Sequence, residues 1–154
     1  MIRRAVIRRF AACVLLGAGV GCAQQPIFDS QWPDAYWRSG SFVLLAIDTE
    51  AQMALHYDSH YSPGLVGPTV FSVGANDHYV VAKQHPARDA TTFDRSVTNY
   101  YVVDRTVYKY EGEKPKIEVL GPFTRAEFDS VSRTLELPKF TKTFATLEWQ
   151  STRE

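Results

Sequence analysis

The sequence predicts an α+β domain, namely a mostly antiparallel β-sheet of six to eight strands with one C-terminal α-helix at about 124–136. Short runs rich in β-branched and aromatic residues recur between turn residues from residue 41 onward, which is typical of strands. A helical pattern follows only after these strands, which argues against repeated βαβ units. The length of 154 residues leaves room for one such domain.

Five segments carry the strand signal most clearly, because they are apolar or alternating and are bounded by turn residues. They are 41–49, 53–59, 69–73, 78–84 and 97–105. Two shorter strands are expected on either side of residues 113–115, and a last strand is expected in the tail at 139–149. The segments 62–68, rich in Pro and Gly, and 87–96, polar and aperiodic, are predicted to be loops.

The stretch FSVGANDHYVVAKQHP at 71–86 predicts a β-hairpin. Asn76 and Asp77 provide side chains that are common in tight turns, and Gly74 is free to adopt a positive φ there. Pro86 ends the second strand because proline has no backbone N–H to donate.

The helix prediction depends on local signals at its start. Thr124 is followed three residues later by Glu127, which is a capping box. Phe123 and Phe128 are spaced as a hydrophobic staple, and Pro138 stops the helix.

The N-terminus predicts export. Four arginines and no acidic residue precede the apolar run 10–20, which is shorter than the roughly 20 residues that a membrane-spanning helix needs. This pattern indicates a secretory signal peptide at 1–21. We divide the rest of the chain into a lipid anchor and tether at 22–36 and a single β-rich domain at 37–150.

The residues Gly19-Val20-Gly21-Cys22 resemble a bacterial lipobox, in which Cys22 would carry the lipid, palmitate included. Gly19 departs from the leucine that is usual at its position. The alternative is cleavage after Ala23 by ordinary signal peptidase, which would give a secreted periplasmic protein. Ala23 after the cysteine, rather than Asp, favours the outer membrane.

The charge balance excludes some partners. The chain has 17 basic and 17 acidic residues, so removal of the four signal arginines leaves 13 against 17, a net charge of about −4. Such a domain has no electrostatic basis for binding nucleic acid. The predicted partners are the membrane, through lipidated Cys22, and an envelope protein.

His56, Asp58 and His60 are the metal candidates, because alternate residues of a strand point to one face. Two imidazoles and a carboxylate suit zinc or iron. The competing interpretation is a strand end whose polar side chains face water. We predict no cofactor on this basis.

Lys83, Gln84 and His85 are predicted to form a binding edge at the sheet rim beside the 87–96 loop. His85 has the chemistry of a general base, but no Ser or Cys nucleophile stands in a recognisable motif, and no catalytic residue is predicted. Adjacent Tyr100 and Tyr101 must point to opposite faces of the sheet, so at least one lies at the surface or under the helix.

The combination of SVGANDHYVVAKQHP, TNYYVVD and GPFTRAEF resembles a family of small bacterial exported, lipoprotein-type proteins of unknown function. The resemblance covers roughly residues 39–144. It implies a compact exported domain, and it implies no activity or catalytic residues.

Together these observations predict a lipid-anchored cell-envelope protein that faces the periplasm and is a non-enzymatic binding or assembly module. One alternative is a metal-dependent enzyme or metal-binding protein that uses His56, Asp58 and His60. Another is an inhibitor or immunity-type protein that inserts the 59–68 or 84–96 loop into a partner's cleft.

Overall fold

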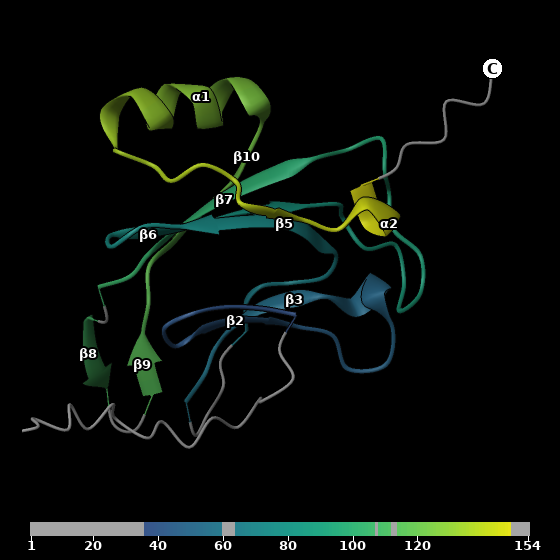
Figure 1. Ribbon diagram of the computed structural model, residues 1–154, viewed down its shortest axis with the longest axis horizontal. Coiled ribbons are helices and arrows are strands. Elements are labelled where there is room, and N and C mark those ends of the chain that lie inside the picture. The colour runs from purple at the N-terminus through teal and green to yellow at the C-terminus, as the bar shows by residue number, and fades with distance from the viewer. Residues whose placement is uncertain (1–35, 60–63, 107, 112–113, 149–154) are drawn as a thin grey trace, which may run out of the picture.

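The structure is a computed structural model that describes residues 36–59, 64–106, 108–111 and 114–148. The predicted signal peptide, Cys22 and His60 lie outside these residues. Within them, eleven strands form two antiparallel sheets and one two-stranded ribbon. Figure 1 shows the layers, with helix α1 (Arg125–Thr134) above the second sheet and the first sheet below it. The α+β prediction is confirmed, with more strands than the six to eight expected.

The first sheet has the strand order β1-β2-β3-β4. Its strands are β1 (Trp37–Ser39), β2 (Phe42–Leu45), β3 (Ala54–Tyr57) and β4 (Gly64–Val66). A 3-10 turn at Glu50–Gln52 connects β2 to β3. The loop prediction for 62–68 is wrong in its centre, because Val66 pairs with Leu55 and makes β4 an edge strand. A Pro- and Gly-rich sequence is compatible with an edge strand, which pairs on one side only.

The second sheet has the order β10-β7-β6-β5-β11. Its strands are β5 (Val70–Ala75), β6 (Tyr79–Gln84), β7 (Asn99–Asp104), β10 (Val119–Phe123) and β11 (Lys142–Thr143). The ribbon consists of β8 (Tyr108–Glu111) and β9 (Lys114–Lys116). Strands β6 and β7 pair along their whole length, and this regular register fixes which side chains share a face.

The main core lies between the two sheets. Fully buried side chains from both inner faces meet there, among them Leu44, Met53, Leu55, Val73, Val80 and Val103. The outer face of the second sheet carries a smaller cluster beneath α1. There Phe128 packs on Tyr100, with ring centroids 5.0 Å apart.

Helix α1 begins as the sequence predicts. The Thr124 side chain accepts a hydrogen bond from the Glu127 backbone, and the Glu127 carboxylate accepts one from the Thr124 backbone at 2.7 Å. Phe123 and Phe128 belong to the same apolar cluster, as a hydrophobic staple requires. No helix in the described residues is long and apolar enough to cross a bilayer.

Two expectations need correction. Gly74 does not adopt a positive φ in the turn; it lies within β5, where the backbone of Lys139 crosses it closely. The predicted tail strand at 139–149 is limited to β11, after which the chain forms the short helix α2 (Ala145–Glu148). This helix places Leu147 in the main core, which a continuing strand at the sheet edge would leave outside.

Candidate functional site

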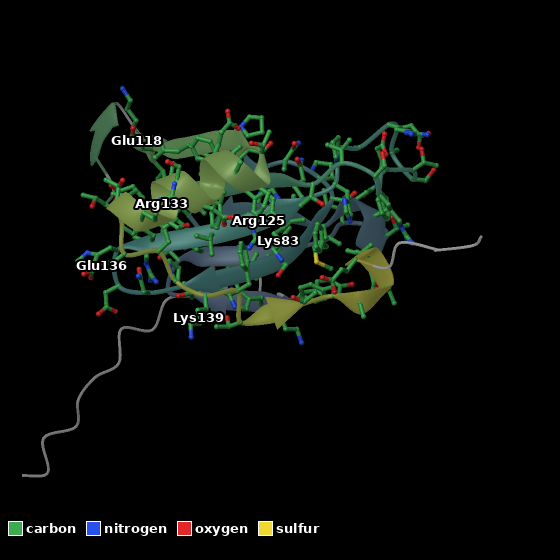
Figure 2. The ribbon with its side chains drawn as sticks, turned by 90° about the horizontal axis from the view of Figure 1, so that it is seen from above. Lys83, Glu118, Arg125, Arg133, Glu136 and Lys139 are labelled. Carbon is green, nitrogen blue, oxygen red and sulfur yellow. The ribbon has the colours of Figure 1, made fainter. Side chains whose placement is uncertain are left out.

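The outer face of the second sheet is covered by α1 over only part of its area. Lys83 pairs with Tyr100 in the register of β6 and β7, and both side chains point to this outer face. His85 lies two residues after Lys83, and Thr98 lies two residues before Tyr100, so alternation places both on the same face. Figure 2 looks onto this face and shows Lys83 between α1 and the segment that carries β11 and α2.

A cavity of about 460 Å³ lies at this uncovered part of the face. Its volume falls in the range of small-molecule binding sites. The sheet contributes its floor and α2 contributes one wall. The lining residues are Phe71, Lys83, His85, Thr98, Tyr100, Ala145 and Glu148.

Lys83 is a half-buried cation inside this lining. Its Nζ lies 4.6 Å from the ring centroid of Phe140 and 6.0 Å from that of Tyr100. These cation–π contacts hold the ammonium group in place. No carboxylate of the described residues forms an ion pair with Lys83. The cavity therefore presents a positioned ammonium group that can take an anionic partner.

His85 is almost completely buried, with an exposed fraction of 1%. Its ring stacks between Phe71 and Phe93, at centroid distances of 4.2 and 5.9 Å. Nδ1 lies 2.7 Å from the carbonyl oxygen of Val97, so this nitrogen carries a proton and donates it. Nε2 is buried without a hydrogen-bond partner. In the neutral ring Nε2 is thus an unused acceptor, which a buried site rarely leaves unsatisfied.

Gln84 points to the opposite, inner face of the sheet. Its Nε2 donates to the carbonyl oxygens of Gly67 and Pro68, at 3.1 and 2.7 Å. Its Oε1 accepts from the Asn99 side chain and the Tyr101 hydroxyl, each at 3.2 Å. The nitrogen and the oxygen of the Gln84 side-chain amide therefore both form hydrogen bonds, which connect β6, β7 and the 67–69 segment. Neither atom is available to bind a ligand.

The three residues of the predicted binding edge are thus divided between two faces. Lys83 and His85 come together in the cavity, whereas Gln84 is buried on the other side of the sheet. Strand β6 is also a central strand, so these residues lie at a strand end and not at a lateral edge.

The 87–96 loop supports His85 from outside and is fixed by two carboxylates. Hydrogen bonds from Thr92 lower the pKa of Asp89 to about 2. The Arg88 guanidinium, 2.9 Å from Asp94, lowers the pKa of Asp94 to about 2. Phe93, between these anchor points, lies on the His85 ring. The loop is therefore held by its own hydrogen bonds in a position that packs Phe93 on the His85 ring.

The residues proposed for a metal site are not assembled in the described part of the chain. His56 lies in β3, and the Asp58 carboxylate is paired with Arg38 at 2.7 Å. His60 is outside the described residues. Within those residues no group of three His, Cys, Asp or Glu side chains could hold a metal ion.

Several lining residues were not singled out from the sequence. Thr98 follows from alternation along β7 once its register with β6 is known. Tyr100 and Tyr101 do point to opposite faces, with Tyr100 partly under α1. The sequence around Ala145 and Glu148 does not indicate that they line the cavity, because helix α2 brings them there from a distant part of the chain.

Comparison with known proteins gives a family and no activity. The searches against curated proteins and against solved structures found no match. One family model matches residues 39–143, which covers most of the two-sheet domain, the whole of α1 and the cavity floor. The chain therefore belongs to the family described as protein of unknown function (DUF3997).

Proposed function

We propose that this chain is a lipid-anchored cell-envelope protein whose domain faces the periplasm and acts as a non-enzymatic binding module. The observation that supports binding most directly is Lys83, which lines a cavity of about 460 Å³ without a carboxylate partner among the described residues. A positioned charge in a concave site is a common feature of ligand pockets.

The surroundings of His85 favour binding over nucleophilic catalysis. Its Nδ1 proton is held by the Val97 carbonyl, and two phenyl rings fix the ring plane. In the described part of the chain, no hydroxyl group is hydrogen-bonded to His85, which is the pairing that activates a serine or threonine nucleophile.

The anchor would concentrate this site at one membrane surface. A tether raises the effective concentration of the domain for any partner in the same membrane. The support for the anchor is the sequence around Cys22, and Ala23 favours the outer membrane. Labelling of cells with radioactive palmitate, followed by fractionation, tests this directly. We expect label and membrane association in the wild type and neither in Cys22→Ala; an unlabelled wild type that fractionates with the periplasm would contradict it.

A partner protein is tested by cross-linking in intact cells, followed by detergent extraction and affinity purification. We expect an envelope protein that is recovered with the wild type and lost or reduced with Cys22→Ala. If the cross-links of such a partner map only to the 59–68 or 84–96 loop, the inhibitor alternative replaces the present proposal. If no envelope protein is recovered above background, the assembly role is wrong, and the binding role depends on small ligands alone.

A further inference from the structure

We propose that the cavity binds a free α-amino acid with an apolar side chain. This inference rests on the proposed binding function and names the ligand class of the same site. It is carried by the charges of the lining, by the unsatisfied acceptor of His85 and by the apolar surface between them.

The lining contains one cation and one anion. Lys83 comes from the sheet floor and Glu148 from the α2 wall. Within the described residues neither side chain has an ion-pair partner, and the two do not pair with each other. The nearby guanidinium of Arg125, 5.8 Å from the Tyr100 ring centroid, is already bonded to both carboxylate oxygens of Asp129 at 2.9 Å.

A ligand that carries both charges matches this lining best. A simple anion would pair with Lys83 but would be repelled by Glu148. A simple cation would pair with Glu148 but would be repelled by Lys83. A zwitterion satisfies both groups at once, with its carboxylate on Lys83 and its ammonium group toward Glu148. Each such hydrogen bond involves two charged groups, which makes it among the stronger polar contacts.

His85 adds the second acceptor that an ammonium group needs. An ammonium has three hydrogens to donate, and Glu148 alone does not use all of them. Nε2 of His85 is buried without a hydrogen-bond partner among the described residues, and we assign the ammonium group of the ligand as its donor. The bond to Val97 keeps the ring in the tautomer that accepts at Nε2.

The spacing of these groups suits an α-amino acid. Lys83 and His85 are two residues apart on one face of an extended chain, which separates their Cα atoms by roughly 6–7 Å. The ammonium and carboxylate groups of an α-amino acid are joined through a single carbon atom. With one hydrogen bond of about 2.9 Å at each end, such a ligand has the size to bridge two side chains that start from neighbouring positions on one face.

The rest of the cavity can take an apolar side chain. The Phe71 ring and the Ala145 methyl group are part of the lining, and the volume of about 460 Å³ exceeds what the charged groups of an amino acid fill. Phe71 is the extra residue at a bulge in β5, between the pairs Val70–Gln84 and Ser72–Lys83. Its ring packs in the main core cluster and also forms part of the cavity lining.

Isothermal titration calorimetry on the full-length protein, extracted from membranes in detergent, tests the proposal. The probes are L-leucine and its two halves, 4-methylpentanoate, which lacks the ammonium, and 3-methylbutylamine, which lacks the carboxylate. L-valine, L-methionine and L-phenylalanine extend the series. We expect at least one of the four amino acids to bind saturably, and both halves of leucine to bind at least tenfold more weakly than leucine.

Two variants assign the charges, and one is a matched control. Lys83→Met should weaken amino acid binding at least tenfold, while its unbranched chain still packs on Phe140 and Tyr100. Glu148→Gln should weaken it to a similar extent. Lys139→Met, at an exposed residue outside the lining, should leave it unchanged. Circular dichroism and the urea midpoint of each variant show that it is folded.

Three results would overturn the inference. The first is equal binding of leucine and 4-methylpentanoate, which would indicate a site for a simple anion. The second is amino acid binding that Lys83→Met leaves unchanged. The third is no binding of any of the four amino acids. Failure of the ligand class is distinguishable from failure of the proposed function. If the wild type retains a different small molecule that Lys83→Met loses, the ligand class is wrong and the binding role stands.

Discussion

Substitution of Gly74 by alanine tests whether the C-terminal segment crosses the second sheet as the structure has it. A Cβ at this position would overlap the carbonyl oxygen of Lys139, and it would lie 2.9 Å from the Lys139 carbonyl carbon and 3.1 Å from the Phe140 Cα. All three are backbone atoms, so no rotamer change relieves the contact. The segment must shift away from β5, or the strand must distort.

The cost follows from what such a shift breaks. Overpacking of a tight contact typically destabilises a protein by about 1–3 kcal/mol. Displacement of the segment also weakens the hydrogen bond from Thr141 N–H to the Val73 carbonyl, 2.9 Å long, and the packing of Phe140 on Phe128. We expect Gly74→Ala to reduce the free energy of unfolding by about 3 kcal/mol, which lowers the melting temperature by roughly 10 °C.

Urea denaturation monitored by circular dichroism measures this loss, and Gly67→Ala is the matched control. Gly67 is exposed, and a Cβ there would meet only the Gln84 Nε2, at 4.0 Å, which is an ordinary contact. We expect the control to lie within about 0.5 kcal/mol of the wild type. Equal stability of Gly74→Ala and Gly67→Ala would refute the close crossing of Lys139 over β5, and with it one boundary of the uncovered face that holds the cavity.

Four further predictions concern the sheet, the helix, the loop and metal content. Gln84→Leu leaves the groups that now bond this amide unpaired and should cost about 2–4 kcal/mol by urea denaturation; a loss below about 0.5 kcal/mol would contradict the network. Thr124→Ala should cost about 1 kcal/mol by loss of the helix cap, whereas Thr124→Ser should remain close to the wild type. Asp89 and Asp94 should titrate with pKa values of about 2 by carboxyl-detected NMR. Because these pKa values lie below the unfolded value of about 3.9, their stabilisation is complete above that pH and is lost as the pH falls through about 2; titration of both near 4 would contradict the loop geometry. Elemental analysis of protein purified without chelators should give zinc and iron far below one equivalent, and one equivalent of either would support the metal-site hypothesis at His56, Asp58 and His60.

The local features of this fold could be predicted from the sequence. The start of α1 is encoded within four residues, Thr124 to Glu127, whose side chains satisfy each other's backbone. Strands β6 and β7 pair in a regular register, and most of their residues are apolar, β-branched or aromatic, as strand propensity favours. In both cases the residues that determine the structure are neighbours in the chain.

Features that depend on distant contacts could not be predicted in the same way. Gly74 reads as a turn glycine, yet its role is set by Lys139, 65 residues further along the chain. The β4 strand has a loop-like composition and is defined by its pairing with β3. The tail forms α2 because Leu147 reaches the core, which no local pattern indicates.

The candidate site also combines residues whose placement follows from a local pattern with residues that are placed by distant contacts. Lys83 and His85 share a face because alternate residues of a strand do, so their proximity follows from the sequence. The same rule puts Gln84 on the other face, so the three could not form one binding edge. Glu148, which gives the cavity its second charge, is brought there only by the folding of the tail.

The central claim is that the cavity around Lys83 holds a small ligand, and native mass spectrometry tests it most directly. The full-length protein is extracted from membranes, and the small molecules released on denaturation are compared for the wild type, Lys83→Met and the control Lys139→Met. The account predicts a bound small molecule that is retained by the wild type and by Lys139→Met and lost from Lys83→Met. Equal retention by all three proteins, or release of nothing from the wild type after incubation with the candidate amino acids, would contradict it.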